Sequence, residues 1–292
     1  MQVTVSTKEQ LEIVLEIKPA RVYVELGVCC GGDKGDRFAT ERFVTLPHIM
    51  REETGTDEED MRWVFEESAA CGYRGVLARN LEQVGYLVQN GYQGEIVTDA
   101  SLYVWNNGSV SFLNEVCGDA LAGVTLPYEL SYQELQEIRA DVPRTMVVYG
   151  RIPMMVSANC VKRTTAACLR SSERSAATSI VMNEKESEQS AMTITDRMQH
   201  DFPVMLNCRY CYNVILNTVP LSLHKQLPLM VRDAMAEAFR VDLTTETAQE
   251  SEQILTYFKK QIRRARFDKG KAKIQTPPYE AYTTGNYRRS AE

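Results

Sequence analysis

Short apolar runs alternate with amphipathic segments along the first half of the chain. The runs are rich in β-branched residues and apolar throughout, which is typical of strands buried on both faces of a parallel sheet. In the segments between them, apolar residues recur three and four positions apart, as on one face of an α-helix. This pattern predicts seven strands before residue 151, near Val3, at 21–27, at 42–47, near Val76, and at 95–99, 122–127 and 145–150.

Several predicted helices carry signals at their ends. Asn80 is the expected cap of a helix over 80–91, and Gly91 is its expected stop. Ser131, with Glu134 three residues later, predicts a capping box for the next helix. The other helices in this half follow from apolar spacing, from about Thr7 (Leu11, Val14, Leu15), from about Asp57 (Met61, Val64, Phe65) and over 110–118.

Regular patterning returns after residue 212. A helix within 220–238 is expected to carry Met230 and Ala234 toward the core, and residues 239–243 predict an eighth strand. A final helix is predicted from about Thr247 to Arg266, with its cap among Thr244, Thr245 and Glu246.

Eight strands joined by helical crossovers predict a closed (β/α)8 TIM-like barrel, and the alternative is a doubly wound open sheet. The chain is expected to be a single barrel domain over 1–292. Residues 151–212, which follow strand seven, break the pattern and are interpreted as a cysteine-bearing insertion at the carboxyl ends of the strands, where barrel enzymes carry their active sites. Within it, the polar run 169–191 predicts a flexible segment.

Four of the eight cysteines lie in this insertion, as a C-x7-C pair, Cys160 and Cys168, and a C-x2-C pair, Cys208 and Cys211. Four thiolates suit zinc or an iron–sulfur cluster, and the spacing alone does not separate these two. A free cysteine is also a common small buried hydrophobe, which is the alternative for each of the four.

Composition narrows the class of protein. The chain has 292 residues, of which 44% are hydrophobic, and it contains no run of eighteen apolar residues, so no transmembrane helix is expected. The N-terminus lacks a basic stretch followed by an apolar one, and eight cysteines are too few for a secreted disulfide scaffold. A cytoplasmic protein with reduced thiols is the simplest interpretation.

The net charge of −6 argues against a broad nucleic-acid surface, but the segment 259–273 is strongly basic. It is either a solvated helix face or a patch that contacts RNA phosphates. The candidate contacts are Lys259, Lys260, Arg263, Arg264 and Arg266.

Candidate catalytic residues follow the predicted strand ends. Asp99, Glu129 and Asp242 are placed to orient a substrate at the barrel mouth, although helix capping or loop structure is the plainer role for these carboxylates. Cys29 and Cys30 also follow a strand end and are expected to point to the same face. A peptidase needs an activated nucleophile or a metal-bound water, and the sequence has no HExxH and no GxSxG motif. His48, paired in space with Cys30, is the remaining candidate for that chemistry, whereas His200 and His224 are expected to be ordinary surface or core residues.

The stretches VYGRIPMMVSANC, DFPVMLNCRYC and FRVDLTTE together resemble the collagenase-like peptidase family, peptidase family U-32. The segments GVLARNLEQVGYL, VTDASLYVWNN, VTLPYELSYQELQEI and TTGNYRR resemble further parts of that family, so the likeness covers nearly the whole chain. It is greatest to the second half of longer members, which implies that this chain is a domain of a longer protein with a second, N-terminal barrel domain as a partner.

What the resemblance implies for function is divided. Some members are collagenase-like endopeptidases, and others take part in prephenate- or cluster-dependent hydroxylation of rRNA or tRNA bases or of a small aromatic, ubiquinone. In the ubiquinone relatives four cysteines hold a 4Fe-4S cluster, and the resemblance assigns that role to Cys160, Cys168, Cys208 and Cys211. The expected function is therefore that of an iron–sulfur hydroxylation protein, with a peptidase and a non-catalytic scaffold domain as alternatives.

Overall fold

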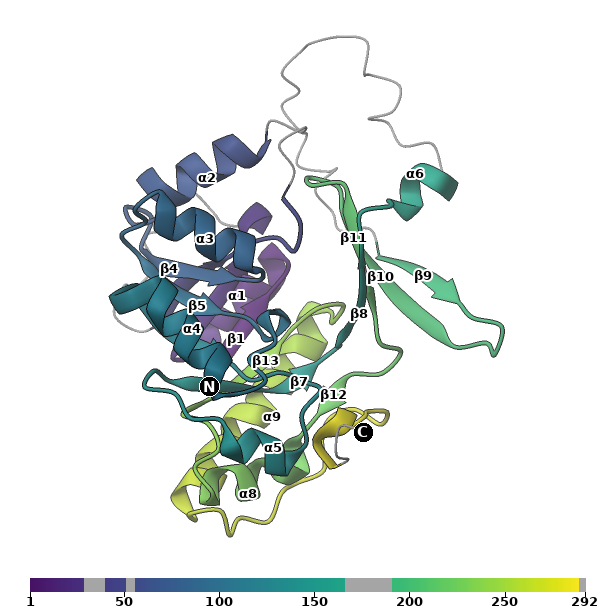
Figure 1. The fold of residues 1–292 in the computed structure, drawn as a ribbon. Helices are drawn as coiled ribbons and strands as arrows, with labels where there is room; N and C mark the ends of the chain where they lie inside the picture. Colours follow the sequence, from purple (N-terminus) through teal and green to yellow (C-terminus); the bar gives the residue numbers. More distant parts are fainter. Residues whose placement is uncertain (29–39, 51–55, 166–190, 289–292) are drawn as a thin grey trace. The chain divides into compact units, whose positions relative to one another are not determined.

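The computed structural model describes residues 1–28, 40–50, 56–165 and 191–288, and these divide into two compact units. The first, called the barrel unit, comprises Met1–Pro47, Asp60–Arg151 and Val219–Glu292. The second, called the sheet unit, comprises His48–Glu59 and Ile152–Thr218. Figure 1 labels the elements of both units.

The barrel unit contains a closed barrel of eight parallel strands. Hydrogen bonds link the strands in chain order and close the ring through the β6–β7, β7–β13 and β13–β1 pairs. The predicted (β/α)8 TIM-like barrel is thus confirmed. Its strands are β1 (Gln2–Val5), β2 (Arg21–Glu25), β3 (Glu41–Thr45), β4 (Tyr73–Ala78), β5 (Glu95–Thr98), β6 (Leu121–Thr125), β7 (Arg144–Gly150) and β13 (Ala238–Asp242).

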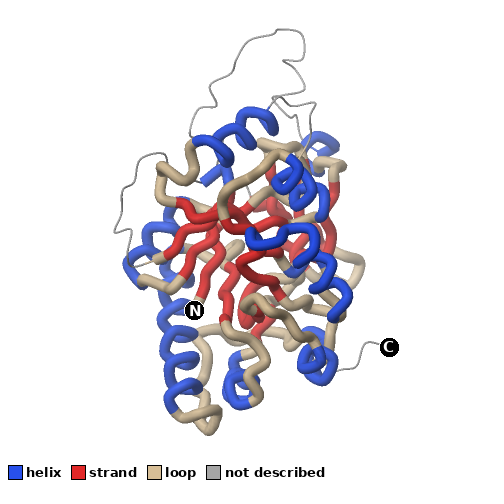
Figure 2. The backbone as a smooth tube through the Cα atoms, turned by 60° about the vertical axis from the view of Figure 1, so that its left-hand side comes forward, coloured by secondary structure: helices blue, strands red, loops and turns tan. Residues whose placement is uncertain are grey.

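Helices surround these strands in Figure 2. Their buried residues are largely apolar, as with Val14, Leu87 and Leu113. Asn80 caps its helix through Gln83 N, and Ser131 with Glu134 forms the predicted capping box. The helices of this unit are α1 (Lys8–Ile17), α3 (Leu81–Gln89), α4 (Asn107–Cys117), α5 (Tyr132–Glu137), α8 (Leu227–Arg232) and α9 (Ala248–Phe267), while α2 (Thr56–Glu66) runs across the division between the units.

Two local predictions near the C-terminus are wrong. Ala234 is exposed and has a φ of 47°, because α8 ends at Arg232 and the chain turns there through the left-handed region. The cap of α9 is Thr247, whose hydroxyl accepts from Glu250 N in a second capping box, and not Thr244, Thr245 or Glu246. A short strand, β12 (Leu221–Ser222), precedes α8 and pairs antiparallel with the end of β7.

The sheet unit is built on a different plan. Its four strands are all antiparallel, in the order β8 (Pro153–Ser157), β11 (Tyr212–Leu216), β10 (Asp201–Asn207) and β9 (Ala191–Thr195). A short helix, α6 (Val161–Thr165), follows β8. Residues 169–190 of the predicted flexible run lie outside the described residues, and residue 191 begins β9.

No helix in the described part of the chain has the length and apolar character needed to cross a bilayer.

Candidate functional site

A fully buried arginine lies inside the barrel. Arg240 is in β13 and only 1% exposed, and its partners lie beyond the neighbouring strand β7, on β6 and at the end of β5. Its Nη2 donates to Asp99 Oδ1 at 2.6 Å, after β5, and its Nη1 donates to Thr125 Oγ1 at 3.3 Å, in β6. Because the buried guanidinium reaches past β7 to residues of β5 and β6, it lies on the inner side of the barrel wall.

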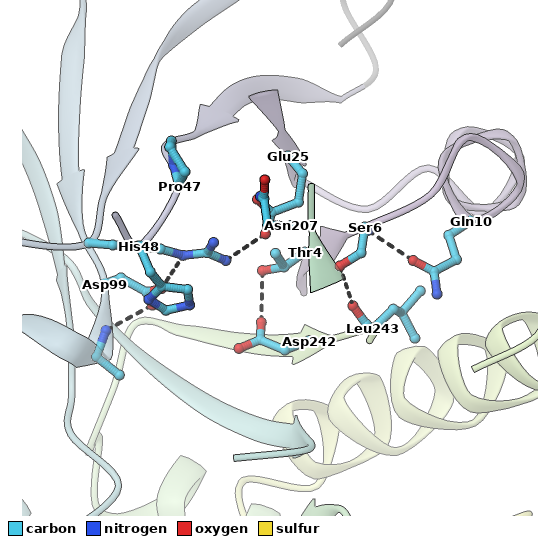
Figure 3. A network of polar contacts seen from close by, with 12 residues as sticks. Thr4, Ser6, Gln10, Glu25, Pro47, His48, Asp99, Asn207, Asp242 and Leu243 are labelled. Carbon is cyan, nitrogen blue, oxygen red and sulfur yellow. Dashed lines mark hydrogen bonds and ion pairs between the residues drawn. The ribbon is translucent and has the colours of Figure 1, made fainter. Parts of the chain in front are cut away.

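Asp242 completes a two-pronged contact with the same guanidinium. The two residues are two positions apart on one strand, so their side chains share a face. Arg240 Nε donates to Asp242 Oδ1 at 2.7 Å and Nη2 donates to Oδ2 at 2.9 Å. Asp242 also accepts from Thr4 Oγ1 at 2.8 Å (Figure 3) and from the Tyr128 hydroxyl at 3.4 Å. Gly150, with a φ of 145°, leaves room here, since a Cβ would lie 2.7 Å from the Asp242 carbonyl oxygen.

The position of Asp99 explains its ionisation. Burial acts to raise its pKa, but Arg240 and Arg79, together with the Ala100 N–H at 2.8 Å, outweigh it and hold the pKa well below the usual range. Burial likewise opposes the charge on Arg240, but Asp242 and Asp99 raise its pKa further above its ordinary value. Both groups are charged at neutral pH.

A second cation, Arg79, extends the network to the end of β2. Its Nη2 donates to Glu25 Oε1 at 2.7 Å and its Nε lies 3.3 Å from Asp99 Oδ2. For Glu25, burial outweighs the attraction of Arg79 and raises the pKa. The three carboxylates of the network, Glu25, Asp99 and Asp242, exceed its two guanidiniums by one charge. A proton on Glu25 or a cation from solution would balance it.

This network gathers at the carboxyl ends of the barrel strands, the face on which TIM-barrel enzymes carry their chemistry. Asp99 and Asp242 are therefore brought together as predicted. Glu129 is not: the interactions found among the described residues do not connect it to the network, and its Oε2 is buried without a hydrogen-bond partner. Burial raises the pKa of Glu129.

Two exposed aromatic residues follow directly after Asp99. Tyr103 and Trp105 are 55% and 47% exposed, and their rings meet edge to face with centroids 6.4 Å apart. Tyr103 has a φ of 52°, which is uncommon for a bulky residue. Trp105 N donates to Tyr103 O at 2.7 Å, so a tight turn holds the pair in place. Asp99 caps the short helix Ala100–Leu102 that leads into this turn.

Sequence reasoning missed Arg240, Arg79, Glu25 and Tyr128. The signal for two of them was present, because FRVD and RVYVE place Arg240 and Glu25 beside apolar residues of predicted strands. A charge in a buried strand requires a buried partner. For Arg79 and Tyr128, which follow strands as many surface residues do, the sequence carries no comparable signal.

In the sheet unit, the C-x2-C pair forms the turn between β10 and β11. Asn207 Oδ1 accepts from Tyr210 N at 3.1 Å, and Asn207 pairs with Tyr212 across the turn. Cys211 has a φ of 55°, and its Sγ lies 3.9 Å from the Cys208 carbonyl oxygen. The turn is thus held at both ends by strand pairing.

Cys160 reaches the same end of this sheet. β8 ends at Ser157, opposite Asn213 of β11, and Val161 N donates to Asn213 Oδ1 at 2.9 Å. That bond fixes the residue after Cys160 beside the residue two positions after Cys211. Three of the four predicted ligands therefore lie at one end of the sheet, and Cys168 lies outside the described residues. In the described ranges, no three His, Cys, Asp or Glu side chains are close enough to hold a metal ion.

The three histidines occupy separate places. His48 belongs to the sheet unit, where its backbone N–H donates to the Tyr212 hydroxyl at 3.1 Å and its ring meets the Tyr212 ring edge to face. Cys30, its proposed partner, and Cys29 lie outside the described residues. His200 is exposed and lies beside Asp196, whereas His224 is 1% exposed.

The predicted phosphate-contacting cations lie on α9. Lys259, Lys260, Arg263 and Arg266 are exposed, and Arg264 is half-buried. Lys259 Nζ donates to the carbonyl of Ile17, at the end of α1, and Arg266 Nη2 donates to the carbonyl of Glu237, just before β13. The basic end of α9 therefore lies at the amino ends of the barrel strands, on the face opposite the buried network.

The chain matches no family model and no curated protein. Among solved structures, a chitinase from Chromobacterium violaceum is similar over 94% of this chain and 99% of its own, at 8% identity and a TM-score of 0.37. At this level of similarity, the match carries no information on function.

Proposed function

We propose that this chain is an iron–sulfur protein of hydroxylation chemistry, whose substrate is an RNA base or another small planar aromatic. The observation that carries the proposal is that Cys160, Cys208 and Cys211 lie at the same end of the sheet unit, where the Val161 N–H donates to Asn213 Oδ1. The resemblance to the U-32 family assigns the same cysteines, with Cys168, to a 4Fe-4S cluster.

The chemistry of the donors suits such a group, although in the described residues the side chains would have to move closer together to hold it. Thiolates are the ligands that iron–sulfur clusters and structural zinc prefer. Cys160, Cys208 and Cys211 are half-buried, and none of them forms a disulfide. Bound there, a cluster would supply one-electron transfer, and its potential would depend on nearby charge and exposure.

The barrel mouth would bind the substrate. Tyr103 and Trp105 offer two exposed ring faces, and stacking on aromatic side chains is how proteins hold unpaired bases. The adjacent network contains two carboxyl groups with opposite pKa shifts. The pKa of Glu25 is raised, so Glu25 can hold a proton, while the pKa of Asp99 is lowered and Asp99 stays ionised. Two carboxyl groups whose pKa values are pushed apart are a common basis for acid and base roles.

Oxygen-free purification followed by metal analysis tests the cluster. We expect brown protein with roughly four irons per chain, and loss of both iron and colour in Cys208→Ser. Cys71→Ser is the matched control, because Cys71 has the same intermediate exposure and lies outside the sheet unit. Colourless protein containing zinc, or iron retained in Cys208→Ser, would overturn the proposal.

Substrate stacking is tested separately. Trp105→Ala should weaken binding of single-stranded RNA by about 1–3 kcal/mol, the cost of losing one stacked base. Phe112→Ala is the control, since Phe112 is 50% exposed but lies on α4, away from the strand ends. Equal losses in the two variants, measured by fluorescence titration, would contradict a stacking site at Tyr103 and Trp105.

A further inference from the structure

A cavity of the barrel unit lies outside the barrel wall. It has a volume of about 660 Å³ and is bounded by His224 and Lys225 on one side and by residues 274–280 and Tyr282 on the other. The wall beneath it is β7, because β12 pairs with β7 and the Tyr149 ring packs against Tyr279 and against Phe258 of α9. Cavities of this size are typical of sites for small organic ligands.

His224 is the buried polar group of this cavity, and one of its nitrogens is already engaged. Tyr279 and Ser222 hydroxyls lie 2.5 Å apart, and Ser222 Oγ lies 2.7 Å from His224 Nδ1. When the Tyr279 hydroxyl donates to Ser222 Oγ, as a phenol normally does, the Ser222 hydroxyl donates in turn to His224 Nδ1. The imidazole then carries its hydrogen on Nε2.

That second nitrogen has no partner in the described part of the chain. Nε2 of His224 is buried and makes no hydrogen bond, although the residue lines the cavity. Burial, with a smaller contribution from Lys225, lowers the pKa of His224 to about 4, so the ring is neutral at pH 7. A buried donor without an acceptor costs about 1–3 kcal/mol, which a ligand acceptor would recover.

The rest of the lining favours a flat ring. The His224 ring meets the rings of two lining residues, Tyr282 at 4.9 Å and Tyr279 at 6.2 Å. The Tyr279 hydroxyl is bound to Ser222, so this side chain offers its ring surface to the cavity. The charged residues of the lining, Lys225 and Glu280, balance each other.

We propose that the cavity beside His224 binds a neutral planar heteroaromatic ring that carries a hydrogen-bond acceptor, about as large as a nucleoside. The ring stacks against the tyrosines, and its acceptor takes the hydrogen bond from His224 Nε2. This site is separate from the barrel mouth and does not depend on the proposed iron–sulfur cluster.

The test uses the full chain labelled with ¹⁵N-histidine. Adenosine, cytidine, guanosine and uridine are each titrated while the imidazole resonances are followed. We expect the His224 resonances to report a neutral ring with hydrogen on Nε2, and to shift saturably with at least one nucleoside. Toluene, which has the ring but no acceptor, should leave the Nε2 signal in place. No shift of the His224 signals with any nucleoside, or a shift confined to His48 and His200, would overturn the proposal.

Two variants separate recognition from packing. His224→Phe keeps an aromatic ring but removes the donor, and should weaken nucleoside binding, observed on the ligand by saturation transfer, about tenfold. His224→Gln, which keeps a donor near the Nε2 position, should retain more of the affinity. Equal affinity in His224→Phe and the wild type would overturn the proposal, and if either variant fails to fold, the wild-type titration decides.

Discussion

Arg240 Nη2 lies 2.6 Å from Asp99 Oδ1 and thereby ties the last barrel strand to the loop after β5, 141 positions away in the chain. Both side chains are almost completely removed from solvent. A buried pair of this kind is stabilising only while both partners are present, because a lone buried charge loses its hydration without compensation.

Removing the charge of Arg240 should therefore lower the free energy of unfolding. Arg240→Met fills a similar volume but leaves Asp99 and Asp242 without their shared partner, and we expect a loss of about 3–5 kcal/mol in urea unfolding at pH 7. Arg74→Met is the control. Arg74 contacts Glu41 and Glu95 at the surface with a half-exposed side chain, so its loss should cost no more than about 1 kcal/mol. Similar losses in the two variants would mean that the interior pair contributes little.

Neutral substitutions of Asp99 and Glu25, the two carboxyl groups beside Arg79, should change the free energy of unfolding in opposite directions. The folded-state pKa of Asp99 is lowered, so its stabilisation is present above the unfolded pKa of about 3.9 and is lost as the pH falls. Asp99→Asn should therefore destabilise the protein at pH 7, and the gap from wild type should narrow in acid.

For Glu25 the sign reverses. Its folded-state pKa is raised, so ionisation costs more in the folded chain than in the unfolded one. Glu25→Gln should be as stable as wild type or more stable at pH 7, with the difference vanishing as the pH falls and wild-type Glu25 takes up its proton. Urea unfolding curves of both variants over pH 3 to 8 would check the contrast, and two variants with the same sign would contradict the assigned pKa directions.

Much of the barrel was predictable because each local signal agrees with the closed ring. The apolar run containing Val76 and the capping box at Ser131 each need only neighbours in sequence to specify their element. The interior network was less accessible. Asp99 could be placed at a strand end from sequence, but its pairing with Arg240 depends on β13 lying beside β7, next to β6 and β5.

In the cysteine region too, the local feature was predictable from sequence and the long-range pairing was not. The C-x2-C pair was recognisable, and the turn that carries it is local. The antiparallel sheet around it was not predicted, since β8, β10 and β11 pair across the long polar run and the pattern there lacks helical crossovers. Only that sheet explains how Cys160 comes to the end that carries Cys208 and Cys211.

Asn213 should be critical for this arrangement. It is completely buried, and its Oδ1 accepts from Val161 N while its Nδ2 has no acceptor among the described residues. Asn213→Val removes the acceptor at nearly constant volume. We expect faster hydrogen exchange at the Val161 amide and, if the cysteines bind a cluster, a lower iron content in oxygen-free preparations.

Asn217→Val serves as the comparison, because Asn217 lies just beyond the other end of β11 and its Oδ1 accepts from Thr218 N. It should leave both the Val161 exchange rate and the iron content unchanged. Iron lost equally in the two variants would indicate general destabilisation of the sheet unit and not misplacement of Cys160.

The basic end of α9 gives a prediction about where RNA contacts the protein. Its exposed cations lie at the amino ends of the strands, so they could bind phosphates but could not by themselves bring a base to the mouth on the opposite face.

Each phosphate contact contributes about one to the slope of log K against log salt. Lys260→Ala together with Arg263→Ala should therefore lower that slope by roughly two and weaken binding to all sequences alike. Lys8→Ala, an exposed lysine on α1, should leave the slope unchanged. A wild-type affinity that barely changes with salt would show that α9 is simply a solvated helix face. If instead the α9 variant has a reduced slope but keeps the part of the binding that depends on Trp105, phosphate contacts and base stacking are separate.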